Sequence, residues 1–179
     1  MLQAGLHNLR QASVRITEVS PRDGLQHESE FVPTLRKISL INALSRTGVA
    51  EIEASSFVSP AAIPQLADSD EVLRAIDRIP GVTYSALVPN ERGLERARAA
   101  GVDKIAVFTA ASNSFTRHNI KATVQESLVR FRPIVAAAKR DGLAVRAYLS
   151  TVVFCPYEGR IAPAQVRDVM ERLLDLAVD

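Results

Sequence analysis

The sequence lacks tryptophan and has a single cysteine, Cys155, among its 179 residues. One cysteine excludes an internal disulfide and favours a reducing compartment, so we expect a cytoplasmic protein. No apolar run approaches the length of a membrane span, and residues 1–13 lack the apolar centre of a signal peptide. We therefore predict no membrane partner, an N-terminal lead over residues 1–13, and one domain over residues 14–179.

An excess of charge of one sign is also missing. The 22 basic and 20 acidic side chains are interspersed and give a formal net charge of +2. No basic run is interleaved with aromatic residues, so the sequence predicts no nucleic-acid partner. The phosphate-binding patterns GxGxxG and GxxxxGK[ST] are absent, which disfavours a nucleotide-binding fold.

Five strand-like apolar runs organise what is present. A glycine precedes four of them, and glycine just past a helix end tolerates the left-handed conformation that terminates a helix. Each glycine therefore indicates a junction between a helix and the next strand. The runs cover residues 14–19, 50–54, 83–88, 104–109 and 144–150.

Helical spacing recurs between these strands. Thr123 and Glu126 form a capping-box pattern ahead of one helix, and Pro133 predicts that this helix is kinked or split. Two apolar stripes should face a sheet, one from residues 163–178 and the other made of Leu35, Ile38, Ile41 and Leu44.

Alternating strands and helices indicate the α/β class, because parallel strands need helical crossovers. An open doubly wound sheet and part of an eight-fold barrel both satisfy this pattern. The barrel is favoured because unusual polar residues follow the strand ends, where barrel enzymes place their chemistry. We therefore predict a partial TIM (β/α)8 barrel with about five βα units. The polar positions are Arg22, Asp23, Glu53, Asn90, Ser112, Asn113 and residues 148–155.

The segment 17–26, TEVSPRDGLQ, runs from the first strand into a turn that carries Arg22 and Asp23. A carboxylate is a hard oxygen ligand for Mg²⁺ or Mn²⁺, and a guanidinium can bind a carboxylate or an enolate oxygen. Glu51 and Glu53 share one face of the second strand, and burying an unpaired carboxylate there costs several kcal/mol. The pairing of Arg22 with Asp23 indicates carbon-acid chemistry.

Plainer interpretations stay open at this point. Asp23 and Gly24 would also suit an ordinary turn. Glu53 would also serve as a buried ion-pair partner of Arg15 or Arg146. Cys155 is expected to be a small apolar or loop residue rather than a nucleophile, because no histidine is paired with it.

Several segments resemble the hydroxymethylglutaryl-CoA lyase family in order and spacing. They are EVSPRDGLQ (18–26), IEASSFVSP (52–60), LVPN (87–90), the run 108–119, and YLS (148–150) followed by CPYEG (155–159). The resemblance covers the chain from about Val14 onward. It implies a metal-dependent TIM-barrel lyase that cleaves 3-hydroxy-3-methylglutaryl-CoA to acetyl-CoA and acetoacetate.

The resemblance also implies roles for individual residues. Asp23 would be a ligand of a divalent cation, Mg²⁺ or Mn²⁺, while Arg22 would stabilise the enolate oxygen and Glu53 would belong to the acid/base network. The acyl-CoA thioester would contact Arg22, Gln26, Ser56 and Tyr148.

The sequence departs from the family pattern because only five strand patterns precede Asp179, and the family's His-x-His ligand pair is absent. We therefore expect a truncated lyase-like enzyme that pairs with a complementary C-terminal half or forms a homo-oligomer, and whether it is active alone stays open. A condensing enzyme like 2-isopropylmalate synthase and a non-catalytic half-barrel are the alternatives.

Overall fold

Five parallel strands form a single sheet whose order follows the chain in this computed structural model, which describes residues 14–179. This arrangement confirms the α/β class and the partial barrel. The predicted N-terminal lead lies outside the described residues. The strands are β1 (Thr17–Glu18), β2 (Glu51–Ser56), β3 (Thr83–Leu87), β4 (Lys104–Ala110) and β5 (Ala144–Ser150).

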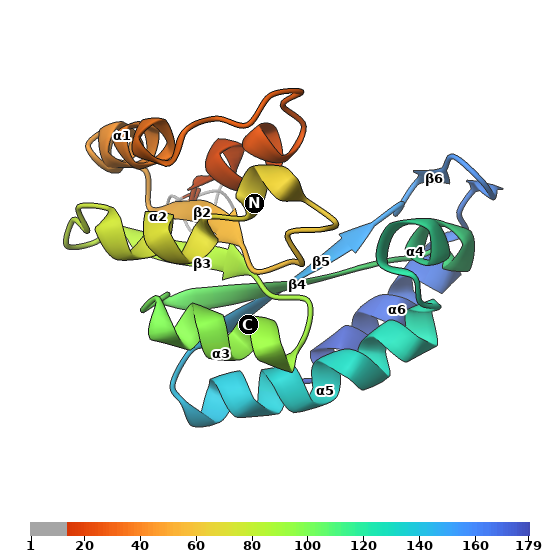
Figure 1. Cartoon of the computed structure of the whole chain (residues 1–179). Helices are drawn as coiled ribbons and strands as arrows, with labels where there is room; N and C mark the ends of the chain where they lie inside the picture. The colour runs from red at the N-terminus through yellow and green to blue at the C-terminus, as the bar shows by residue number, and fades with distance from the viewer. Residues whose placement is uncertain (1–13) are drawn as a thin grey trace, which may run out of the picture.

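Helices connect the strands, and α3 and α5 run side by side along the sheet (Figure 1). A short hairpin extends beyond the end of β5, close to α4. None of the helices within residues 14–179 is both long and apolar enough to cross a membrane. The helices are α1 (Thr34–Ser45), α2 (Ser69–Ala75), α3 (Glu91–Ala99), α4 (Asn113–Ile120), α5 (Val124–Arg140) and α6 (Pro163–Leu174); η1 (Ser20–Gly24) and η2 (Pro64–Leu66) are single turns, and the hairpin is β6 (Phe154–Cys155) with β7 (Gly159–Arg160).

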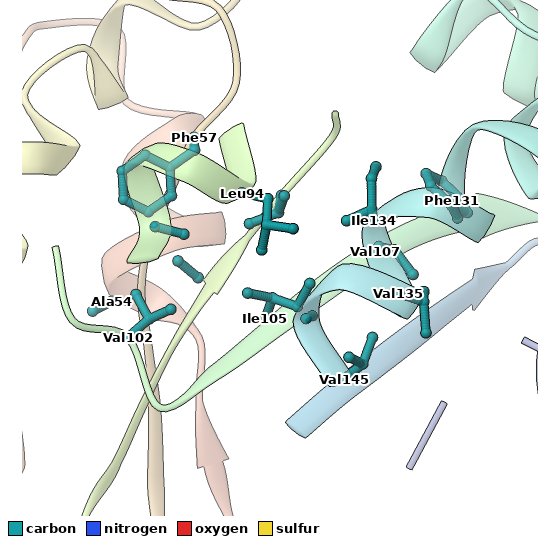
Figure 2. Close-up of a cluster of buried hydrophobic side chains, with 14 of the residues drawn as sticks. Ala54, Phe57, Leu94, Val102, Ile105, Val107, Phe131, Ile134, Val135 and Val145 are labelled. Carbon is teal, nitrogen blue, oxygen red and sulfur yellow. The ribbon is translucent and has the colours of Figure 1, made fainter. Parts of the chain in front are cut away.

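The main core lies between the helices and one face of the sheet. Figure 2 shows Phe131 and Ile134 of α5 facing Ile105 of β4 and Val145 of β5. All four side chains are buried. Each such side chain contributes about 1.5–3 kcal/mol when it is fully removed from water. This face of the sheet therefore holds the fold together.

The opposite face of the sheet is polar and curved. Arg146 on β5 donates to Thr17 on β1 over 3.2 Å, although three strands separate β5 from β1 in the sheet. A flat sheet with strands about 4.8 Å apart would hold these residues much farther from each other. The sheet is therefore rolled into a half-barrel, and its interior face carries the charged side chains.

The predicted stripes are only partly correct. Ile41 is fully buried, whereas Leu35 at the start of α1 is 75% exposed, and Met170 and Leu174 of α6 are also exposed. Helical spacing shows which residues share a face, but it does not show how far the neighbouring elements extend beneath that face.

The predicted capping box at the start of α5 is confirmed. The Thr123 hydroxyl accepts from the Glu126 backbone N–H, and the Glu126 carboxylate accepts from the Thr123 backbone N–H. The predicted split at Pro133 is wrong, because α5 is one helix from Val124 to Arg140. Proline removes a hydrogen bond to the carbonyl of Val129, but both residues lie on the exposed side, where water can bind that carbonyl.

We expect Thr123→Ala to destabilise the protein by about 1 kcal/mol, because the first turn of α5 loses its side-chain acceptor. Urea unfolding followed by circular dichroism measures this change. Val129→Ala is the control, since it shortens an exposed β-branched side chain on the same helix. An equal loss in both variants would contradict a specific capping contribution.

Candidate active site

The segment after β1 forms a single wide helical turn, η1, that brings Arg22 and Asp23 to the mouth of the half-barrel. The Asp23 N–H donates to the Val19 carbonyl over 2.7 Å, and the Ser20 N–H donates to the Glu18 carboxylate over 2.7 Å. Wide π-type turns are rare and are frequent at functional sites. Asp23 and Gly24 therefore lie at the end of a π-type turn.

Glu53 is fully buried, and both of its carboxylate oxygens have partners. Arg22 donates from Nε to Oε1, and the Tyr148 hydroxyl donates to Oε2. Arg22 also donates from Nη1 to Oδ1 of Asp23 over 2.6 Å. The Arg22 side chain is 13% exposed and that of Asp23 is 50% exposed, so the four groups lead from the barrel interior to solvent.

The alternative partners suggested for Glu53 belong to Glu51 instead. Arg146 forms a two-point ion pair with Glu51, with N–O distances of 3.0 and 3.1 Å, and Arg15 lies 3.8 Å from the same carboxylate. Lys104 donates to Glu51 over 2.6 Å. The alternative in which Arg15 or Arg146 pairs with Glu53 is therefore not what the structure shows, because both arginines lie against Glu51, two residues earlier on β2.

Sequence reasoning missed Lys104 and Ser85 as members of this interior. Ser85 donates to Glu51 over 3.1 Å. A period-of-two interpretation of β3 and β4 would have placed both residues on the interior face, because Ser85 and Lys104 pair directly in the parallel register.

Glu51 and Tyr148 are among the interior groups whose pKa values are clearly shifted. Burial raises the pKa of the Tyr148 hydroxyl, and its hydrogen bond to the Glu53 carboxylate raises it further. Burial also acts to raise the pKa of Glu51, but the hydrogen bond from Lys104 and the charge of Arg146 outweigh it and lower the net pKa. Tyr148 therefore stays a proton donor, and Glu51 stays ionised.

These shifts predict acid sensitivity that depends on Glu51. A carboxyl group whose pKa is lower in the folded state stabilises the fold above its unfolded pKa, about 4.3, and this stabilisation is lost as the pH falls through the folded pKa. Glu51→Gln should cost about 2 kcal/mol at neutral pH, and the difference from the parent should shrink below about pH 4. Urea unfolding across this range measures it. Glu30→Gln, on an exposed loop, should change neither the free energy of unfolding at neutral pH nor its dependence on pH.

The remaining predicted residues lie at varied depths. Gln26 is half-buried just after η1, while Ser56 at the end of β2 is fully buried, with its hydroxyl 3.4 Å from the Leu87 carbonyl. Cys155 is buried in a second small core with Ala111 and Ile161, as expected for a small apolar residue. Within residues 14–179, Gln26, Ser56 and Cys155 take no part in the hydrogen bonds that join the other four residues. Those four are Arg22, Asp23, Glu53 and Tyr148.

The described residues supply one candidate metal ligand rather than a complete set. No group of three or more His, Cys, Asp or Glu side chains within residues 14–179 is arranged to hold a metal ion. Asp23 offers a half-exposed carboxylate, and Oδ1 already accepts from Arg22. His27 lies nearby, with Nδ1 2.8 Å from the Asp23 carbonyl oxygen. A divalent cation at Asp23 would need additional oxygen ligands.

The sequence is similar to that of known lyases. The chain is 50% identical to the mitochondrial hydroxymethylglutaryl-CoA lyase of Bos taurus and 51% identical to the cytoplasmic 3-hydroxy-3-methylglutaryl-CoA lyase of Danio rerio, each over 163 residues. These alignments cover 91% of the chain but 50% and 49% of the two relatives. The chain therefore spans about half the length of the curated relatives it matches.

Solved structures give the same picture. The HMG-CoA lyase from Brucella melitensis superposes with a TM-score of 0.91 at 54% identity, over 92% of this chain and 58% of that one. An HMG-CoA lyase from A. baumannii, solved with coenzyme A and 3-methylmalate, gives 0.88 at 39% identity, over 92% and 54%. The HMGL-like family model matches residues 13–178. This chain therefore belongs to the HMGL-like family.

Proposed function

We propose that this chain provides the first half of the active site of a carbon–carbon lyase that cleaves 3-hydroxy-3-methylglutaryl-CoA to acetyl-CoA and acetoacetate. The observation that supports this proposal most directly is the contact of Arg22 with both Glu53 and Asp23 at the mouth of the half-barrel. The likeness to lyases at about half identity supports the same reaction.

Arg22 is proposed to stabilise the enolate oxygen that develops when the carbon bond breaks. Its Nε and Nη1 are held by Glu53 and Asp23, and no partner for Nη2 lies among the residues that the structure describes. The guanidinium is therefore oriented before substrate arrives and retains a donor for a substrate oxygen. A preorganised donor of this kind contributes about 3 kcal/mol to transition-state stabilisation.

Glu53 and Tyr148 are proposed to belong to the network that carries out proton transfer in the reaction. As the carbon–carbon bond breaks, the tertiary hydroxyl gives its proton to the network of Glu53, the thioester holds the electron pair as an enolate, and a proton is then returned to the enolate carbon to give acetyl-CoA. The raised pKa of Tyr148, caused by burial and by Glu53, keeps its hydroxyl protonated, so it holds Glu53 in place as an acceptor. Gln26 and Ser56 stay proposed substrate contacts, as does Tyr148.

A divalent cation is proposed to assist at Asp23. The HMGL-like family is divalent-metal dependent, and we propose Mg²⁺ or Mn²⁺ for this chain. The cation would polarise substrate oxygens when bound. Because Asp23 is the one proposed ligand in residues 14–179, the other ligands would come from substrate, water, or further protein.

The proposed partners are an acyl-CoA thioester and a polypeptide that supplies the complementary half of the barrel, or else a second copy of this chain. Within residues 14–179, β1 and β5 are the two edges of the sheet, and an unpaired edge strand offers backbone groups to another strand. We also propose the cytoplasm as the location, in line with cytoplasmic relatives.

The test is a product assay on the purified chain, alone and mixed with the separately expressed second half of a close lyase relative. Each sample receives 3-hydroxy-3-methylglutaryl-CoA and Mg²⁺, and mass spectrometry follows acetoacetate and acetyl-CoA. We expect cation-dependent product in the mixture and its loss on chelation. A parallel mixture receives acetyl-CoA and a 2-oxo acid instead, and release of free coenzyme A there would indicate a condensing enzyme. If neither cleavage nor condensation occurred, the catalytic proposal would be contradicted.

A further inference from the structure

We propose that Glu51, which lies one layer below the candidate site, is a positioning residue that orients Arg146 against Tyr148 and sets the charge around Glu53. The catalytic meaning of this inference rests on the proposed lyase function. The geometric claim, that Glu51 controls the surroundings of Tyr148, stands without it.

The carboxylate of Glu51 lies in the barrel interior and accepts hydrogen bonds from cationic side chains. It is fully buried, and three cationic side chains lie around it, one from β4, one from β5 and one from the segment just before β1. Arg146 of β5 approaches with both terminal nitrogens, Lys104 of β4 donates over 2.6 Å, and Arg15 lies 3.8 Å away. A two-point contact fixes the plane of the Arg146 guanidinium, which a single hydrogen bond would not do.

Arg146 connects Glu51 with the candidate site. Its Nη1 lies within 3.5 Å of the Tyr148 hydroxyl, and its guanidinium carbon lies 5.9 Å from the centre of the Tyr148 ring. Tyr148 in turn donates to Glu53, whose other oxygen accepts from Arg22. A continuous series of polar contacts therefore joins Glu51 to the candidate catalytic pair.

The same connection follows from the strand periodicity. Glu51 and Glu53 are two residues apart on β2, and Arg146 and Tyr148 are two residues apart on β5, so each pair points to one face. The curvature of the sheet brings the two strands together across the interior, with β3 and β4 between them along the sheet. Two successive layers form, one of Glu51 with Arg146 and one of Glu53 with Tyr148.

Glu51 also sets the sign of the local field. It is one carboxylate facing Arg15, Lys104 and Arg146, while Glu53, Asp23 and Arg22 complete the charges around Tyr148. Without Glu51, the Arg146 charge near the phenol would be uncompensated and would favour tyrosinate. Without Lys104, Glu51 would have one cation fewer, and the phenol would be held more firmly in its protonated form.

The experiment is a titration of Tyr148 in the full chain by carbon NMR of ring-labelled tyrosine. The chain has three tyrosines, and Tyr148→Phe assigns the signal. We expect Glu51→Gln to lower the midpoint and Lys104→Met to raise it, each by on the order of half a pH unit. The double variant Glu51→Gln with Lys104→Met should return close to the parent. Ser85→Ala, which removes a neutral donor to Glu51, should move it least.

Opposite signs in the two single variants would support the proposal, because a merely structural defect would move both midpoints toward that of a free tyrosine. Shifts of the same sign, or an unmoved signal in Glu51→Gln, would overturn it. Glu51→Gln should still fold, since the side chains of Lys104 and Arg146 are 16% and 26% exposed and can reach water. Opposite shifts without lyase activity in any sample would contradict the proposed function and leave the positioning role supported.

Discussion

Replacing Arg22 by alanine is expected to lower kcat for cleavage of 3-hydroxy-3-methylglutaryl-CoA by roughly 100- to 1,000-fold in the assembled enzyme, with a much smaller change in KM. The guanidinium is held by Glu53 and Asp23 and is aimed at charge that develops only as the carbon bond breaks. An interaction made in the transition state alone is lost from kcat rather than from substrate binding. Steady-state kinetics on the complemented mixture measures both constants.

Two further variants sharpen this prediction. Arg46→Ala removes a different arginine whose ion pair with Asp77 is on the surface, and it should leave both constants unchanged. Arg22→Lys should recover little activity, because one ammonium cannot reproduce the separate Nε and Nη1 contacts to Glu53 and Asp23. A rise in KM with kcat preserved in Arg22→Ala would show that Arg22 serves only to bind substrate.

Replacing Phe131 by alanine is expected to destabilise the fold by about 3–5 kcal/mol, the largest stability effect among our predictions. Phe131 is 3% exposed in the middle of α5, within the core between that helix and the sheet (Figure 2). Truncating it removes the transfer free energy of the ring and leaves a cavity, since the helix is held on both sides by its neighbours. In a chain of this size the melting temperature should fall by roughly 10 °C.

Phe154→Ala is the matched control, because it makes the same substitution on the β6–β7 hairpin, where the ring is 64% exposed. It should change the free energy of unfolding by no more than about 0.5 kcal/mol. Differential scanning calorimetry or urea unfolding would measure both variants. If the two variants lost similar stability, Phe131 would not be packed in the main core.

The fold class could be predicted because local chemistry and tertiary structure agree along most of the chain. Glycines at the helix ends and apolar runs placed the strands within a few residues, and the Thr123–Glu126 pair placed the start of α5. The errors arose where local rules depend on surroundings. Pro133 did not split α5 because its side of the helix is exposed, and Leu35 was not buried because spacing does not report what lies beneath a helix.

Only part of the predicted set of site residues lies together, since Gln26 and Ser56 take no part in the hydrogen bonds that join the other four. Arg22, Asp23, Glu53 and Tyr148 were named from the sequence, and the structure brings these four together. The partners of the two glutamates were not separable from strand periodicity, because Glu51 and Glu53 point the same way and differ only in depth. The structure assigns Arg146 to Glu51 rather than to Glu53.

By itself, the sequence determined the order of strands and helices, their parallel connection, and that Glu51 and Glu53 share one face of their strand, because all three follow from local conformation and alternation. Only the tertiary structure decided which interior charges meet. Arg146 and Tyr148 on β5 reach Glu51 and Glu53 on β2 across the curved interior. Along the sheet, β3 and β4 lie between these two strands. That curvature is a sum of small twists between strands, and it is not encoded in any single stretch of residues.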